Sequence, residues 1–328
     1  MTKVHTISFE HTVSCELSSG PATVSMRIVA PAELVPGRTT PVLFAFPGGG
    51  YTKAYFDLQP PGGGYSMARY LADRGIVVVA CDNLGTGEST RPIPASSLIL
   101  DDVVDADQAV VESVLAALRA GTLPQLAGPI DPIPVGLGHS MGAGLVTVHQ
   151  ARRAPYAGVV LMGRALSGSP IPAPPAPGTS EGRWLPGSEQ HADFEASAEL
   201  VDGYYLHRHH TAWQRYLFFW DDTPEQLIEY DEGMATVFPL DLARELSSSD
   251  GPNERSAGQI TSPVLVVFGE RDLTNDPFGE LGKYPGSSDI RLLRVARSAH
   301  CHNMSSSREW MWRRIADWTH EIAGQSGS

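Results

Sequence analysis

The stretch VGLGHSMGAG, residues 135–144, constrains the fold of this chain most. An apolar strand pattern runs directly into a helical pattern, and Gly138 and Gly142 stand on either side of Ser140. A strand-to-helix turn this tight leaves no room for side chains two residues from the serine, which explains both glycines. The helix N-terminus beneath the serine favours a developing negative charge. The pattern therefore predicts a nucleophilic serine raised above a sheet on a sharp turn.

Apolar strands alternate with helices on both sides of this turn. The apolar runs lie at 41–46, 76–82, 133–138, 158–163, 263–269 and 290–296, and the helical patterns at 65–75, 100–121, 141–152 and 307–322. Such alternation predicts an α/β fold with a mostly parallel, doubly wound sheet. Residues 4–29 alternate polar and apolar around SSGP, which predicts an N-terminal antiparallel hairpin.

The alternating pattern is interrupted between residues 164 and 256, where large aromatic residues are concentrated in GYYLHRHHTAWQRYLFFW at 203–220. We expect an inserted, mainly helical cap at 164–256. The core then consists of two parts, residues 1–163 and residues 257–328.

A base and an orienting acid are predicted where later strands end. Asp272 follows the strand 263–269 and His300 follows the strand 290–296. The carboxyl ends of parallel strands share one edge of a sheet, where open α/β folds place their sites. His139 is unsuited as the base, because side chains of consecutive residues diverge in such a turn. His302 is the alternative to His300, and Asp276 is the alternative to Asp272.

The oxyanion formed by attack of the serine requires backbone N–H donors. The amide of Met141 follows the nucleophile. The second donor is expected in PGGGYTKAY, where glycines let the backbone approach a substrate closely. Gly49 is the predicted donor, with Gly48 and Gly50 as neighbours in the same loop.

In these motifs the chain resembles the α/β-hydrolase superfamily. PGGGY, ACDNLGTGEST, GHSMGAG, FGERD and SAHCHN occur in the order of that family, over about residues 40–163 and 257–325. The resemblance implies a triad of Ser140, Asp272 and His300. It also identifies DNLGTGES as a stabilising turn. Pro47 departs from the family, since many relatives carry histidine there, and this leaves the exact oxyanion donor open.

The resemblance implies acyl transfer through an acyl-enzyme on Ser140, with no cofactor and no metal. The length and layout are also similar to those of bacterial zearalenone-type lactone hydrolases. A peptidase, a thioesterase or an acyltransferase on the same triad is the alternative. A non-catalytic ligand-binding protein on this fold is a further alternative, against which the intact triad argues.

The aromatic residues of the cap favour a bulky, apolar ester or lactone as substrate. The predicted pocket residues are Gly48, Gly50, Tyr51, Tyr205, Trp213 and Trp220. The HRHH run at 207–210 is interpreted as a solvated helix face, because no carboxylate or cysteine stands at ligand spacing.

Composition limits the partners. The formal net charge of −13 argues against nucleic acid and anionic membranes as partners. The three scattered cysteines, together with an N-terminus that lacks an apolar signal segment, favour a soluble cytoplasmic protein. No run approaches the roughly 18 apolar residues that a membrane helix needs. The sequence leaves the oligomeric state open.

Overall fold

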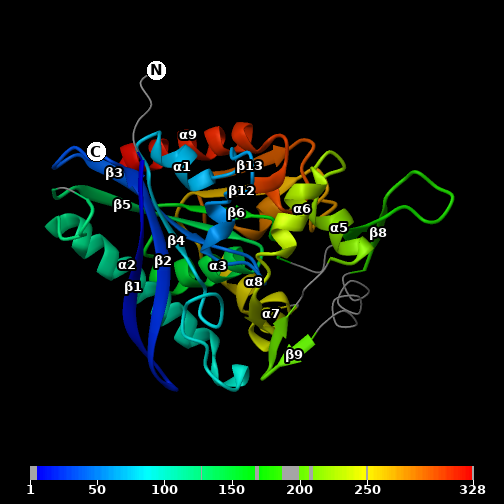
Figure 1. Ribbon diagram of the computed structural model, residues 1–328, viewed down its shortest axis with the longest axis horizontal. Coiled ribbons are helices and arrows are strands. Elements are labelled where there is room, and N and C mark those ends of the chain that lie inside the picture. Colours follow the sequence, from blue (N-terminus) through cyan, green and yellow to red (C-terminus); the bar gives the residue numbers. More distant parts are fainter. Residues whose placement is uncertain are drawn as a thin grey trace.

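The computed structural model describes residues 6–126, 128–166, 170–186, 199–206, 210–248 and 250–326. Its centre is an eight-stranded sheet with the order β1-β2-β4-β3-β5-β6-β12-β13 (Figure 1). The strands are β1 (Thr6–Leu17), β2 (Gly20–Pro31), β3 (Thr39–Phe46), β4 (Val77–Cys81), β5 (Asp131–His139), β6 (Val159–Met162), β12 (Val264–Gly269) and β13 (Ile290–Val295).

The sheet is antiparallel at one edge and parallel elsewhere. β1 and β2 form a hairpin in which Leu17 lies opposite Gly20, and β2 runs antiparallel to β4. All other neighbours in this sheet are parallel. The central strands β3 and β4 are buried almost throughout, as their unbroken apolar sequences require. The predicted fold class, a mostly parallel sheet with an N-terminal hairpin, is confirmed.

Helices cover both faces of the sheet. They are α1 (Met67–Ala72), α2 (Leu100–Ala120), α3 (Met141–Arg153) and α9 (Arg308–Ser326), with short 3₁₀ helices η1 (Lys53–Phe56), η2 (Ala95–Ser97), η3 (Gly279–Lys283) and η4 (His302–Met304). Along β3, Val42 and Phe44 join the core that α2 and α3 cover, whereas Leu43 and Ala45 join the core beneath α1 and α9. The sheet is therefore doubly wound.

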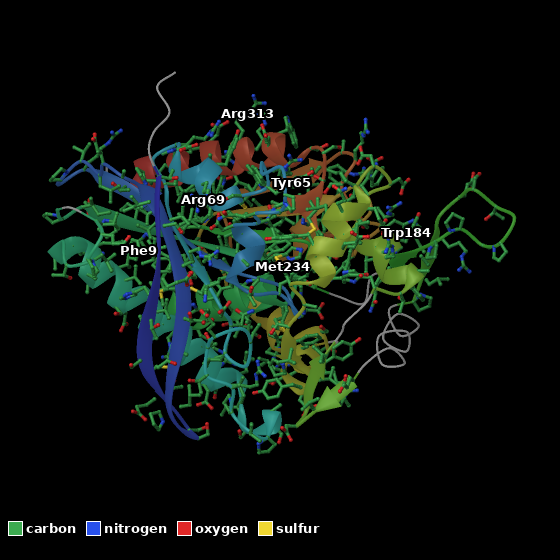
Figure 2. The ribbon with its side chains drawn as sticks, in the orientation of Figure 1. Phe9, Tyr65, Arg69, Trp184, Met234 and Arg313 are labelled. Carbon is green, nitrogen blue, oxygen red and sulfur yellow. The ribbon has the colours of Figure 1, made fainter. Side chains whose placement is uncertain are left out.

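The segment between β6 and β12 contains both helices and short strands. The helices are α5 (Ala212–Phe218), α6 (Glu225–Glu232), α7 (Leu240–Ser247) and α8 (Pro252–Ala257), and the strands are β7 (Ile171–Ala173), β8 (Arg183–Leu185), β9 (Glu199–Val201), β10 (Tyr204–Leu206) and β11 (Val237–Pro239). The strands form two small sheets, β11-β10-β9 and β7-β8. Trp184 on β8 and Phe9 on β1 lie on opposite sides of the molecule (Figure 2). The predicted boundaries at 163/164 and 256/257 stay predictions.

A buried histidine joins the helices beneath the sheet. His149 on α3 is fully buried and its Nε2–H donates to Gln108 Oε1 on α2, 2.9 Å away. In this tautomer the Tyr156 hydroxyl donates a hydrogen bond to His149 Nδ1 at 3.1 Å. Burial, helped by the charge of Arg153, lowers the pKa of His149 to about 3. The imidazole is therefore neutral in the folded protein.

This burial predicts a pH-dependent stability. Below pH about 6.5 the unfolded chain protonates His149 while the folded chain does not, so acidification favours unfolding. Each such group contributes about 1.4 kcal/mol per pH unit between its two pKa values. His149→Gln should reduce the slope of unfolding free energy against pH by about that amount between pH 6 and pH 4. Denaturant titrations at several pH values measure it. His320→Gln, at an exposed histidine, is the control, and an unchanged slope in His149→Gln would contradict the prediction.

Candidate active site

Ser140 lies on the predicted sharp turn between β5 and α3. Its backbone has φ 51° and ψ −115°, a conformation that is strained for any residue other than glycine. A Cβ atom on Gly138 would lie 2.4 Å from the backbone of Ala143, and one on Gly142 would lie 2.1 Å from the Phe46 carbonyl oxygen. Both flanking positions therefore require glycine, for the reason that the sequence pattern indicated.

Asp272 and two histidines meet at the carboxyl ends of β12 and β13. Asp272 Oδ1 accepts a hydrogen bond from His300 Nδ1 at 2.7 Å, and Oδ2 accepts one from His302 Nε2 at 2.8 Å. All three side chains are buried. Burial alone raises the pKa of Asp272, but the charges and hydrogen bonds of the two histidines outweigh it, so the pKa lies well below its ordinary value. The carboxylate is therefore charged.

The two histidines differ in which ring nitrogen they use. His300 donates through Nδ1, which leaves Nε2 on the far side of its ring. His302 donates through Nε2, and its Nδ1 is buried with no hydrogen-bond partner among the described residues. Nδ1 bound to the acid and Nε2 turned away is the arrangement that a general base of a triad needs. The geometry therefore favours His300 over His302 for that role.

His139 packs behind the reacting groups. It is fully buried, stacks on Tyr55 with ring centroids 4.5 Å apart, and donates through Nε2 to the His300 carbonyl oxygen at 2.9 Å. Burial, with the neighbouring charges of His300 and His302, holds the pKa of His139 well below its ordinary value. A neutral imidazole that holds the backbone of His300 is consistent with the prediction that His139 is not the base.

The glycine loop after β3 lies against the serine. A Cβ on Gly48 would lie 3.1 Å from Ser140 Cβ, and one on Gly49 would lie 3.3 Å from the ring of Phe238. Gly50 has φ +80°, which favours glycine, whereas the φ of Gly49 is not in that region. Within the described residues, the N–H groups of Gly49 and Met141 donate to no protein acceptor. Phe238 on β11, which was not predicted from the sequence, packs against this loop at Gly49 and Gly50.

The model of the α/β hydrolase family matches residues 42–313. The chain belongs to the α/β hydrolase family. No curated protein matches the chain in sequence. The family match begins within β3 and ends within α9, so it includes the segment between β6 and β12.

Solved structures show the same fold in this family. An esterase from Thermogutta terrifontis superposes with a TM-score of 0.60 at 14% identity, covering 96% of this chain and 99% of that chain. A monoacylglycerol lipase from Paleococcus ferrophilus gives a TM-score of 0.59 at 14% identity, with 96% and 99% covered. A proline iminopeptidase from Mycobacterium smegmatis gives 0.60 at 16% identity, with 97% and 100% covered. At these identities the likeness shows the fold alone.

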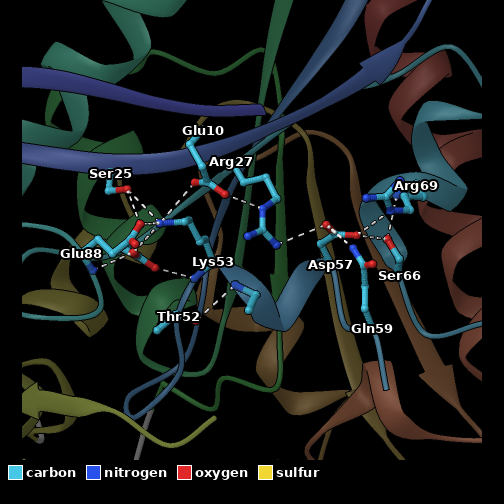
Figure 3. A network of polar contacts seen from close by, with 12 residues as sticks. Glu10, Ser25, Arg27, Thr52, Lys53, Asp57, Gln59, Ser66, Arg69 and Glu88 are labelled. Atoms are coloured by element: carbon cyan, nitrogen blue, oxygen red, sulfur yellow. Dashed lines mark hydrogen bonds and ion pairs between the residues drawn. The ribbon is translucent and has the colours of Figure 1, made fainter. Parts of the chain in front are cut away.

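The turn DNLGTGES, residues 82–89, is hydrogen-bonded to the segment that follows the glycine loop of this α/β hydrolase. Lys53, just after the loop, donates its backbone N–H to Asp82 Oδ1 at 2.7 Å and its ammonium to Asp82 Oδ2 at 3.0 Å. The ammonium also bonds Ser25 and Glu88 (Figure 3). Burial lowers the pKa of Lys53, but the neighbouring Glu88 and Asp82 raise it by more, so its pKa lies above the ordinary value. The ammonium therefore stays charged in its ion pairs with Asp82 and Glu88.

The predicted aromatic pocket residues make mainly packing contacts. The Tyr51 hydroxyl is buried against Asp231, and Tyr205 is buried with its ring centroid 5.0 Å from that of Phe238. Trp213 donates through Nε1 to the Pro172 carbonyl at 2.8 Å, and Trp220 lies against the Arg271 guanidinium. Two surface hollows, of about 310 and 620 Å³, are lined by neither Ser140 nor His300. The roles of the four aromatics in a pocket stay predictions.

The histidine run of the cap is only partly described. His207 and His209 lie outside the described residues. The interpretation as a solvated helix face is wrong for His210, whose side chain is 6% exposed and bonds the buried Asp231. No local sequence pattern indicates this pair, because the two residues are 21 positions apart in the chain. No group of three potential metal ligands occurs within the described part of the chain.

The three cysteines are free thiols, and Cys81 and Cys301 are buried. Cys301 lies between the two histidines that bind Asp272, and burial holds the pKa of its thiol well above the ordinary value. Such a thiol is a poor nucleophile and a poor metal ligand. None of the described helices combines the length and apolar character that crossing a bilayer requires.

Proposed function

We propose that this α/β hydrolase is a serine hydrolase that cleaves carboxylic esters, lactones included, of bulky apolar compounds. One observation carries the proposal: a charged, buried Asp272 binds Nδ1 of His300 beside the strained turn that presents Ser140. Among the described residues the His300 ring is bonded to Asp272, and no hydrogen bond joins it to the Ser140 hydroxyl. Such contacts often tighten only when substrate binds.

In the proposed mechanism Ser140 Oγ attacks the ester carbonyl while His300 Nε2 takes its proton. Asp272 holds the imidazole in the required tautomer and stabilises the imidazolium. The N–H groups of Met141 and Gly49 stabilise the oxyanion. His300 then gives its proton to the leaving alkoxide, which leaves an acyl-enzyme on Ser140. Water attacks that ester with His300 as base, so the acid is released and the serine is restored.

The contacts at the glycine loop support an ester of a bulky apolar compound as the substrate. Phe238, from the segment between β6 and β12, packs against Gly49 and Gly50, and Tyr205 packs against Phe238. The esterase and the lipase named above share the fold, but so does the proline iminopeptidase. The layout that resembles zearalenone-type enzymes is what favours lactones. The same residues serve an amide, a thioester, or transfer of the acyl group to an alcohol.

A substrate panel separates these chemistries. We expect turnover of aryl esters and of large lactones, with amides and thioesters at least about tenfold slower in kcat/KM. Product analysis with added alcohol distinguishes hydrolysis from acyl transfer. Preferred cleavage of an anilide would favour the peptidase alternative, and binding of these compounds without turnover would favour the non-catalytic alternative.

The nucleophile is tested by Ser140→Ala. The variant should lose hydrolysis by on the order of a million-fold and should not react with a fluorophosphonate, because the attacking oxygen is gone. Its thermal unfolding should stay close to that of the wild type. Retention of more than about a tenth of the activity would show that another residue attacks.

The two histidines that bind Asp272 are separated by paired variants. His300→Ala should be nearly inactive, since its Nε2, turned away from Asp272, is the proposed acceptor of the Ser140 proton. His302→Ala should lose about tenfold or less in kcat, because Asp272 keeps His300 and the Gly269 N–H as partners. Steady-state kinetics with an aryl ester measure both. The reverse order of effects would assign the base to His302.

The oxyanion loop is tested at Gly49. A valine there would press on Phe238 and displace the loop, and loss of one oxyanion donor costs about 10²–10³ in kcat. KM should change much less, because the ground-state carbonyl bears little charge. Gly282→Val, at an exposed glycine with open space around its Cβ position, is the control. An effect of Gly49→Val confined to KM would show that the loop only shapes the pocket.

A further inference from the structure

A second buried carboxylate lies next to the proposed site. Asp231 on α6 is 2% exposed. Its Oδ2 accepts hydrogen bonds from the Tyr51 hydroxyl at 3.0 Å and from His210 Nε2 at 2.8 Å. Its Oδ1 is buried with no hydrogen-bond partner among the described residues. A buried carboxylate with one unpaired oxygen is costly, so its presence calls for a role other than stability.

The partners of Asp231 come from the loops that hold the reacting groups. Tyr51 directly follows the glycine loop, and its hydroxyl also lies 3.2 Å from the Sγ of Cys301, the residue after His300. Burial raises the pKa of both Tyr51 and Cys301, so both stay protonated near neutral pH. The Tyr51 hydroxyl donates to Asp231, and the Cys301 thiol can then donate to the Tyr51 oxygen. Asp231 thus connects the glycine loop to the histidine loop.

Asp231 is also connected to the His300 loop through helix α5. His210 directly precedes Thr211, the N-cap of this helix, and its backbone N–H donates to Glu232 on α6 at 3.1 Å. Its ring packs against Phe218, and the ring of Phe218 packs against His300. Asp231 therefore fixes the start of the helix whose other end touches the proposed base.

The end of α5 is bonded to both loops of the acid and the base. The Leu217 carbonyl accepts from the His300 N–H at 3.0 Å, and the Phe218 carbonyl accepts from the Cys301 N–H at 2.9 Å. The Phe219 carbonyl accepts from Arg271 Nη2 at 2.7 Å, one residue before Asp272. The last carbonyls of a helix have no partner within the helix, so these loops satisfy them.

We propose that Asp231 is a positioning residue, which holds the glycine loop and the His300 loop in register with each other through α5, Tyr51 and Cys301. The inference rests on the proposed function of Ser140 and His300. Without the carboxylate, Tyr51 and His210 lose their shared acceptor, and α5 can shift together with the loop that it binds. A displacement of about 1 Å at the base is enough to cost on the order of 10²-fold in rate.

Asp231→Leu is the main test, because leucine keeps about the size of the side chain but offers no oxygen to accept from Tyr51 and His210. We expect kcat for an aryl ester, and the rate of fluorophosphonate labelling, to fall by about 10–100-fold. KM should change by less than about threefold, because the reacting groups move rather than the binding surface. Measurements are made well below the unfolding temperature of each variant. Glu229→Leu, on the exposed face of the same helix, is the matched control and should match the wild type.

Tyr51→Phe carries the test independently, and it decides if Asp231→Leu does not fold. Loss of the hydroxyl should lower kcat in the same direction by about tenfold. The double variant should be no slower than Asp231→Leu alone, because both changes break the connection between Tyr51 and Asp231. Wild-type kcat in Tyr51→Phe, a fall in unfolding temperature without a fall in kcat, or additive losses would each overturn the proposal. Failure of the wild type to label at Ser140 would instead overturn the proposed function.

Discussion

The close approach of α3 to β3 at Gly142 is the contact on which the geometry of the site depends. A Cβ there would lie 2.1 Å from the Phe46 carbonyl oxygen, so the helix can begin only where a glycine lets the two backbones meet. The chain then turns at Ser140 with a positive φ, a strain of about 1–3 kcal/mol. β5 pairs with both β3 and β6, and it holds the turn in place. The same contact brings the glycine loop after β3 beside the serine.

The sequence predicted those parts of the site that local rules determine. The glycines around Ser140 are required by a turn of a few residues, and the positions of Asp272 and His300 follow from the ends of buried strands. The right-handed, parallel arrangement of the sheet brings those ends together without further information. The strand limits are therefore within a few residues of the predicted ones, as at β12, predicted at 263–269 and observed at Val264–Gly269.

What the sequence did not predict depends on contacts between distant residues. Three-residue strands such as β10 show no measurable alternation, since their pairing with β9 and β11 is decided by packing. The pair of His210 and Asp231 joins two cap elements whose separate patterns carry no sign of each other. Phe238 likewise appears as an ordinary aromatic residue until β11 places it above Gly49. The binding of Asp272 to both His300 and His302 also required the structure, because either histidine alone fits the motif.

Asp272 and Asp231, both buried beside the proposed site, show that burial by itself does not determine the charge of a carboxylate. Asp272 accepts from two imidazoles and from the N–H groups of Gly269 and Leu273, and its pKa lies below the ordinary value. Asp231 is as deeply buried but receives its hydrogen bonds on one oxygen only, and burial raises its pKa. Both effects follow from desolvation opposed by hydrogen bonds to the charged form. A carboxylate that must stay charged while its histidine gains a proton needs donors on both oxygens. A carboxylate that only joins loops does not, which separates the acid of the proposed triad from its neighbour on physical grounds.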